Sequence, residues 1–290
     1  MQIFFNSAFS ASIYSLVALS FSLVYAPARF FHIAHGVVYA AGAYAAFLGV
    51  GILHWGILPS LMLGVLVAGV LGAVMDVSLF GPLRRRRANP LVLLMASMGL
   101  YVVLQNLISM LFGDDVKSIR TWPVREGLEF LGARITPVQI IIIVAAILIF
   151  AGVILALKHT KMGLAMRAVS SEPELASLSG VASEKVIFIS FVAGSALAGL
   201  AGVLASLDVD MTPTMGMRAL LMGVVAVIVG GVDSIPGIAL GALLLGMAQH
   251  FGVWYISSQW QDAIAFIILL IFLLFRPQGF LGKPLRKATV

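Results

Sequence analysis

The 290-residue sequence contains no cysteine, and only 10% of its residues are charged. Without cysteine, disulfide bridges, thiol nucleophiles and thiolate metal sites are excluded. Soluble domains carry about 25% charged residues, so the shortage of charge excludes a soluble globular protein. The chain has instead 61% hydrophobic residues and a mean hydropathy of +1.09. This composition predicts an integral membrane protein with a single transmembrane domain over residues 1–290.

Charged residues are also missing from the interior of the predicted membrane spans. The nearest acidic residues fall at span edges: Asp76, Asp208, Asp233 and Asp262. Ion-coupled carriers and pumps keep ionisable residues at membrane depth, so their absence disfavours secondary active transport. The sequence shows no serine–histidine pair, no metal-binding cluster and no repeated carbonyl-filter motif. We therefore expect neither an enzyme nor a metal site nor an ion-selective channel.

Apolar runs of bilayer length, or nearly so, recur along the whole chain. They lie at about 4–25, 36–53, 58–76, 91–112, 138–157, 186–207, 217–231, 237–253 and 262–275. Several are shorter than the roughly 20 residues of a straight crossing and adjoin glycine-rich junctions. The pattern predicts an all-α polytopic bundle of about eight to ten helices with broken or re-entrant segments. The N-terminus lacks the basic region of a cleaved signal peptide, so we expect it to belong to the first span.

Lysine and arginine are distributed unequally between the two predicted sides of the membrane. Thirteen of the 18 lie in the loops of one side, including the run from Arg84 to Arg87, and five lie in the loops of the other. The positive-inside rule then places the N-terminus outside and the C-terminus in the cytoplasm. We interpret the arginine run as a topology signal with secondary contact to anionic membrane lipid, and expect no nucleic acid partner. The outer loop 113–137 is either a solvated connector or a landing surface for an extracytoplasmic partner.

A short helix with start and stop signals is predicted in the cytoplasmic loop 158–185. Ser171 and Glu174 have the spacing of a capping box, and Pro173 suits a first helical turn. Gly180 suits a left-handed stop. Leu175, Ala176 and Leu178 are expected to form one apolar face. Such a helix below the membrane is interpreted as the docking element for a cytoplasmic motor protein.

Two glycine-centred junctions predict helices that stop and restart within the membrane. The first, at residues 31–44, contains His32, His35 and Gly36. The second, at residues 229–246, contains Gly230, Gly231, Ser234, Pro236, Gly237 and Gly241. Transporters use such breaks to aim half-helix ends at a polar solute, whereas small residues at four-residue spacing also allow close helix packing. Both interpretations remain open here.

A stripe of small residues, Gly194, Ala198 and Gly202, repeats every four residues in the predicted span 186–207. Small residues at this spacing let helix backbones approach closely. The stripe is either a helix-contact face within the chain or part of a seam between two membrane subunits.

Five motifs, in order along nearly the whole chain, resemble one family of membrane proteins. They are SIYSLVALSFSLVYAPARFFHIAHG, MGLYVVLQNLISMLFGDD, KMGLAMRAVSSEPELASLSGV, GGVDSIPGIALGALLLG and DAIAFIILLIFLLFRPQGFLG. Together they are similar to the LivH-type permease subunits of bacterial ABC importers for branched-chain amino acids, whose close relatives carry urea and other amino acids. The second motif adds Gln105 and Asn106 to the expected solute pathway.

The resemblance implies a multi-pass protein of the bacterial inner membrane that works within a larger complex. The expected partners are a second, LivM-type permease, two ATP-binding subunits and an extracytoplasmic solute-binding protein. ATP is expected to bind those subunits and no cofactor to bind this chain, which contains no GxxxxGK[ST] loop. The residues expected to contact the ATPase are Arg167, Ser171, Glu172, Glu174, Leu175, Leu178 and Gly180. Arg167 has an alternative role as one more inside-positive charge.

This chain departs from the family pattern at three positions of the first junction. His32 stands where asparagine is usual, Ile33 replaces an aromatic residue, and Val37 replaces a glutamate. If this region faces the solute, the loss of a carboxylate and the gain of an imidazole change which polar groups of the solute the region can bind. Urea transport and a passive solute channel therefore stay as alternatives, beside the disfavoured ion-coupled carrier.

Overall fold

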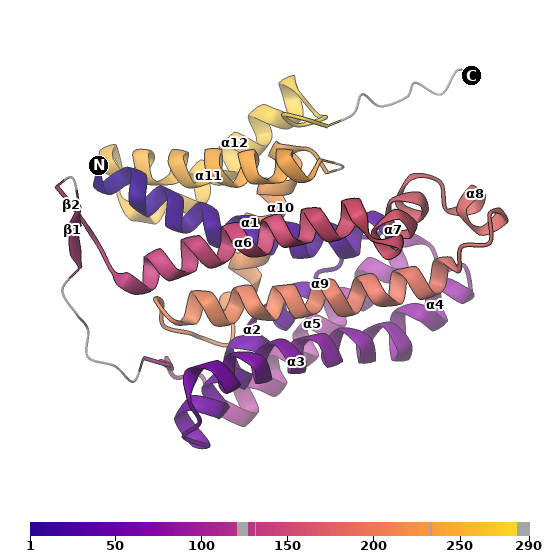
Figure 1. Ribbon diagram of the computed structural model, residues 1–290, viewed down its shortest axis with the longest axis horizontal. Helices are drawn as coiled ribbons and strands as arrows, with labels where there is room; N and C mark the ends of the chain where they lie inside the picture. Colours follow the sequence, from indigo (N-terminus) through magenta and orange to yellow (C-terminus); the bar gives the residue numbers. More distant parts are fainter. Residues whose placement is uncertain (121–126, 131, 233, 283–290) are drawn as a thin grey trace.

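The computed structural model describes residues 1–120, 127–130, 132–232 and 234–282. Several residues used above lie outside this part of the chain: Arg125, Asp233, Lys283, Arg286 and Lys287. The described residues form a bundle in which most of the long helices run side by side (Figure 1).

The first part of the chain builds four membrane-length helical segments. These are α1 (Gln2–Ala28); α2 (His35–Phe47) with the π-helical turn η1 (Leu48–Ile52); α3 (Ile57–Met75), which continues through the π-helical turn η2 (Asp76–Phe80) into α4 (Gly81–Arg85); and α5 (Pro90–Phe112). The second part begins with an antiparallel hairpin of β1 (Leu128–Phe130) and β2 (Ala133–Ile135).

The remaining elements are all helical. They are α6 (Pro137–His159), α7 (Lys161–Ser171), α8 (Pro173–Leu178), α9 (Ser183–Ser206), α10 (Met215–Gly230), α11 (Ile235–Tyr255), the short 3-10 helix η3 (Ser258–Trp260) and α12 (Gln261–Phe275). Within the described residues, eight helical segments are long and apolar enough to cross a membrane, and α10 is a shorter apolar helix. Each predicted apolar run overlaps one of these nine segments, so the predicted polytopic bundle is confirmed.

Several helices begin at a polar cap followed directly by proline. The Asn89 side chain accepts a hydrogen bond from the Leu91 amide, with Pro90 opening α5. Thr136 and Gln139 form a reciprocal capping box at the start of α6. Proline is tolerated there because the first amides of a helix have no intrahelical acceptor.

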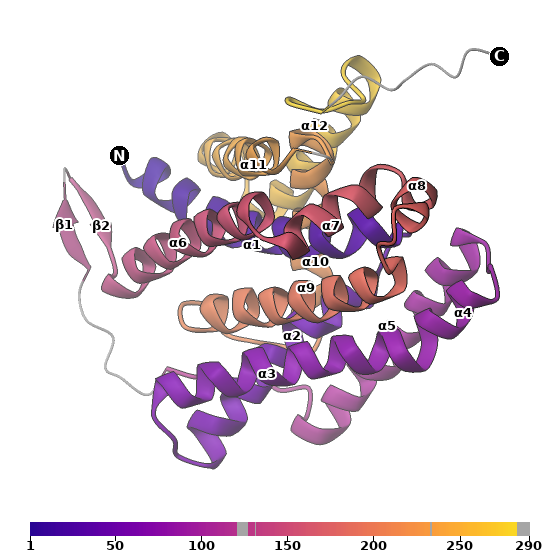
Figure 2. The ribbon, with the colours of Figure 1, turned by 45° about the vertical axis from the view of Figure 1, so that its right-hand side comes forward.

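Helix α9 lies in the middle of the bundle, between α1 and α3 (Figure 2). Its small-residue stripe is buried, and a Cβ atom added at Gly194 would lie 2.9 Å from the Ser20 carbonyl oxygen of α1. At Gly202, a Cβ atom would collide with the Tyr39 carbonyl of α2. The predicted helix-contact face is therefore confirmed, and its burial within one chain contradicts the alternative of an intersubunit seam.

Charged loop residues separate into two ends of the bundle. At the coupling end, which holds α4, α7 and α8, Arg29 donates to the Ser170 and Ser171 carbonyls. At the hairpin end, which holds the N-terminus and the β1–β2 hairpin, the Gln2 side chain donates to the Arg134 carbonyl (Figure 1). The loops grouped by the lysine and arginine count thus meet at common ends. The side of the membrane that each end faces stays a prediction.

An ion pair between Arg120 and Asp210 joins two loops at the hairpin end, beside mutual backbone hydrogen bonds between Lys117 and Met211. The hydrogen bond from Arg120 lowers the pKa of the Asp210 carboxyl from its ordinary value of 3.8. Because the folded-state pKa is depressed, the pair is fully present above pH 3.8 and is lost as the pH falls through the lowered value.

We expect Asp210→Asn to loosen this loop junction without affecting the bundle. Exposed pairs contribute about 0–1 kcal/mol, so the melting temperature should fall by no more than about 4 °C. Tryptic cleavage after Arg120 at pH 8 should become severalfold faster than in the wild type. The control is Asp114→Asn, at a nearby exposed carboxylate outside the junction. Equal cleavage rates in the two variants would contradict the assigned role of the pair.

Candidate pathway and coupling segment

The predicted short helix of the cytoplasmic loop is present as α8, directly after α7. Pro173 occupies its first turn, and Gly180 has the left-handed φ of 83° expected of a helix stop. The predicted capping box is wrong. Ser171 is the last residue of α7, and Glu172 takes the N-cap position of α8 without a side-chain hydrogen bond. A capping side chain needs extended backbone at its own residue, and the helical end of α7 denies this to Ser171.

The predicted apolar face of α8 is only partly correct. Leu175 and Leu178 are 61% and 83% exposed, whereas Ala176 is 6% exposed and faces the bundle. Residues three apart share a helix face and adjacent residues do not, so the two leucines stand together away from Ala176. The two exposed leucines thus form a small apolar patch at the tip of the loop, outside the helices that are long enough to cross a membrane.

The charged residues assigned to the coupling segment lie at its surface. Arg167, Glu172 and Glu174 are exposed, and Arg167 donates to the Lys158 carbonyl at 3.5 Å. Helix α7 turns the other way, with Gly163, Met166 and Val169 buried against the bundle. The segment therefore rests on the bundle through α7 and presents α8 outward.

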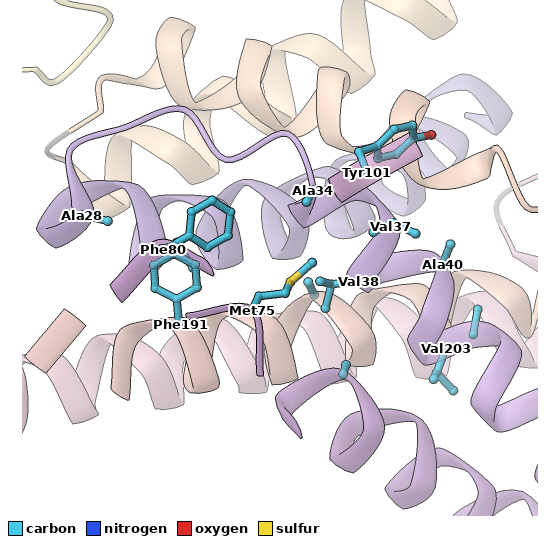
Figure 3. Close-up of a cluster of buried hydrophobic side chains, with 14 of the residues drawn as sticks. Ala28, Ala34, Val37, Val38, Ala40, Met75, Phe80, Tyr101, Phe191 and Val203 are labelled. Atoms are coloured by element: carbon cyan, nitrogen blue, oxygen red, sulfur yellow. The ribbon is translucent and has the colours of Figure 1, made fainter. Parts of the chain in front are cut away.

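The first glycine-centred junction is the connection between α1 and α2, and this interruption of helical structure lies inside the bundle. Helix α1 ends at Ala28, Arg29 adopts the left-handed conformation with φ 57°, and α2 begins at His35. His32 and His35 are 0% and 1% exposed. Non-helical backbone at this depth is tolerated because protein surrounds it. Figure 3 shows Phe80 and Phe191 beside the loop that joins Ala28 to Ala34.

Two serines hold the histidines of this interruption. The Ser20 hydroxyl donates to the Val17 carbonyl at 2.8 Å, so it accepts from His35 Nε2 at 2.9 Å. His32 Nδ1 lies 3.0 Å from Ser97 Oγ, which also accepts from the Ala34 amide. Among the described residues, His32 Nε2 and His35 Nδ1 are buried without a hydrogen-bond partner. The two rings lie 5.8 Å apart, with His32 also against Phe80.

Gly36 lies where the first turns of α2 and α10 pack backbone against backbone. A Cβ atom at Gly36 would lie 2.8 Å from the Gly216 carbonyl oxygen, and one at Gly216 would collide with the Gly36 carbonyl. Sequence reasoning did not identify Gly216, which directly precedes the predicted span 217–231. Val37, which replaces the usual glutamate, is buried in the apolar core and not on an open wall.

The second glycine-centred junction joins α10 to α11, and of the two interpretations left open its glycines fit close helix packing. Ser234 caps α11 by accepting from the Gly237 amide at 3.2 Å, and Pro236 lies in the first turn. Gly230 packs against Gly237, as close helix packing requires. The C-terminal segment covers this turn, since the Leu281 amide donates to the Gly230 carbonyl and Gly231 contacts Gly282.

Gln105 and Asn106 lie on α5, the helix that also presents Ser97 to His32. Asn106 is exposed and donates to the Val102 carbonyl at 2.8 Å, whereas Gln105 is half-buried. They lie about 12 Å along the helix from Ser97.

The predicted pathway residues therefore fall into three separate places. The structure brings together His32, His35 and Gly36, and it places Gln105 and Asn106 further along α5. The α10–α11 turn holds the remaining four: Gly230, Gly231, Ser234 and Pro236.

Comparison with known proteins assigns this architecture to a family. Residues 3–273 match the family described as "Branched-chain amino acid transport system / permease component". The chain is 33% identical over 98% of its length to the high-affinity branched-chain amino acid transport system permease protein BraD of Pseudomonas aeruginosa, and covers 96% of that protein. It is 31% identical, with the same coverage of both chains, to the permease protein LivH of Salmonella typhimurium.

The fold also has a solved counterpart. A chain of "PsaBC from Streptococcus pneumoniae in complex with Fab" aligns with a TM-score of 0.54 and 14% identity, over 94% of this chain and 91% of that one. At this identity the likeness shows a shared fold alone. The family match over nearly the full chain, on a bundle of eight membrane-length helical segments, shows that this protein belongs to the family of permease components of branched-chain amino acid transport systems.

Proposed function

We propose that this chain is the membrane-spanning permease subunit of a binding-protein-dependent ABC importer, resident in the bacterial inner membrane. It moves branched-chain or related amino acids into the cytoplasm, and partner subunits hydrolyse the ATP. The observation that carries the proposal is α8, a short helix outside the bundle with Leu175 and Leu178 exposed. A loop helix with an apolar tip suits a partner groove, and we assign that groove to the ATP-binding subunits.

The mechanism is mechanical, because this chain does no chemistry on the solute. ATP-driven closure of two ATPase subunits displaces α8, and short links join α8 to α7 before it and to α9 after it. Helix α9 packs against α1, α2 and α3, so its displacement reaches the interrupted segment that carries His32 and His35. Half-helix ends and buried polar atoms at such an interruption suit a path for a polar solute.

The remaining partners are proposed from the surfaces of the bundle. The exposed apolar faces of α5, α6 and α12 contact membrane lipid and a second, LivM-type permease that completes the pathway. The exposed Asn106 would line that pathway if it runs along α5. The hairpin end, with its loop of mixed charge, is the landing surface for an extracytoplasmic binding protein.

The proposal is tested by uptake into proteoliposomes that contain the full complex with ATP inside. We expect uptake of radiolabelled leucine, isoleucine or valine only when both ATP and the binding protein are present. Aromatic and acidic amino acids and urea, offered in parallel, define the solute class. A binding protein that retains urea but no amino acid would contradict the assigned cargo.

Two control preparations separate the alternative classes. Solute flux into liposomes that hold this chain alone, without ATPase, would support a passive channel. Uptake that a protonophore abolishes and ATP does not stimulate would support an ion-coupled carrier. Either result would overturn the importer proposal.

A further inference from the structure

The coupling segment is held at both ends by arginine side chains from elsewhere in the bundle. Just before α8, the Arg29 guanidinium donates to the carbonyls of Ser170 and Ser171, the latter at 3.0 Å. Just after α8, in the first turn of α9, Glu184 binds the guanidinium of Arg84 at 3.0 Å. Neither contact was expected from sequence, where both arginines counted only as inside-positive charges.

Arg29 caps the end of α7. The last carbonyls of a helix have no amide partner within the helix, and they carry the negative end of its dipole. A guanidinium that donates to two of them therefore makes a favourable contact of fixed geometry. Arg29 is also the residue at which α1 ends, three positions before the buried His32. It thus joins the coupling segment to the interruption that carries the candidate pathway residues.

Arg84 joins the other end of the coupling segment to α3 and α4. Its side chain is only 9% exposed and binds the buried carboxylate of Asp76 at 2.7 Å as well as Glu184. The guanidinium also lies 5.8 Å from the ring centre of Phe191 on α9. The Arg84 guanidinium thus pairs with two carboxylates, Asp76 on η2 and Glu184 on α9. Without Arg84, the Asp76 carboxylate would remain buried and have no cationic partner.

We propose that Arg29 and Arg84 are positioning residues that hold the two ends of the coupling segment and pass its displacement into the bundle. Arg29 passes the displacement to the interruption before α2, and Arg84 passes it to α3 and α4. The inference rests on the proposed function, because it requires an ATPase that displaces α8. It goes beyond that function by distinguishing Arg84 from Arg85, Arg86 and Arg87, which are exposed.

The test uses the full complex in proteoliposomes and measures solute imported per ATP hydrolysed. The variants are Arg29→Ala and Arg84→Ala, and the matched controls are Arg85→Ala and Arg86→Ala, which remove the same charge from the same run. We expect the amount of solute imported per ATP to fall about tenfold in Arg29→Ala and in Arg84→Ala. A tenfold change corresponds to the loss of one charge-assisted hydrogen bond. ATPase co-purification and ATP hydrolysis should stay within about twofold of the wild type in all four, because the leucines of α8 are unchanged.

If Arg84→Ala fails to elute as a folded complex, two milder variants test the positioning role of the two arginines. Glu184→Gln leaves the Arg84–Asp76 pair intact. Arg29→Lys keeps the charge, but its ammonium ends one bond short of Nη2, the nitrogen that donates to both carbonyls. Both should lower the transport ratio with normal ATPase association. Ratios equal to those of the Arg85 and Arg86 controls, or a loss of ATPase association, would overturn the inference. Absence of ATP-driven uptake in the wild-type complex would instead contradict the proposed function.

Discussion

Replacing Leu175 and Leu178 together by aspartate is expected to detach the ATPase subunits and abolish uptake. Both side chains project from α8, at 61% and 83% exposure. Burying a leucine contributes about 1.5–3 kcal/mol, so losing both weakens the contact by about 10²–10⁴-fold. An aspartate forced into the same groove adds the cost of an unpaired charge. Co-purification of the ATPase and uptake into proteoliposomes measure the effect.

The matched control adds the same charges without removing the leucines. Ser177 and Ser179 are exposed at the end of the same helix, and Ser177→Asp with Ser179→Asp should leave ATPase association within about threefold of the wild type. Membrane insertion of both double variants should equal that of the wild type, because α8 lies outside the bundle core. Full association and uptake in the leucine variant would show that α8 is not the docking element.

Adding a single methyl group at Gly216 is expected to destabilise the whole bundle. In Gly216→Ala the new Cβ atom would collide with the Gly36 carbonyl, which is backbone and cannot rotate aside. Overpacking of this kind costs about 1–3 kcal/mol, or more where backbones must separate. At 2–4 °C per kcal/mol, the melting temperature should fall by roughly 5 °C or more. Thermal unfolding of the purified chain in detergent measures it.

Gly99→Ala is the control for this prediction. Gly99 also lies within a helix, but nothing lies within 4 Å of the Cβ atom that it would gain. The melting temperature of the Gly99→Ala variant should equal that of the wild type or be slightly higher, because alanine favours helix more than glycine does. Equal melting temperatures for the two variants would contradict the close approach of α2 and α10.

Hydropathy and charge predicted the membrane fold because a bilayer imposes rules that act locally. Each apolar run had to become a helix, since its backbone finds no other partners in lipid. Pro173 and Gly180 bounded α8 for the same local reason, through backbone preferences of single residues. The histidine junction was also readable, because glycine and polar residues interrupt an apolar run there.

The failed predictions all depended on which segments meet. Ser171 has the spacing of a helix cap, but it is the last residue of α7 and therefore has helical backbone. For the glycines at residues 230–241 the sequence left a helix break and close packing both open, and the structure shows that they pack α10 against α11. No local pattern reports a contact between residues a hundred positions apart, as between Arg84 and Glu184.

By itself, the sequence determined that this protein spans the membrane many times, that its basic loops gather at one end, and that a short helix leaves the bundle there. Lipid enforces these features residue by residue through the cost of unpaired backbone and charge. Only the tertiary structure decided which of four adjacent arginines is buried in an ion-pair network, which serines hold the two histidines, and which glycines let backbones touch. Those choices depend on distances between helices, and these are set by the packing of the whole bundle.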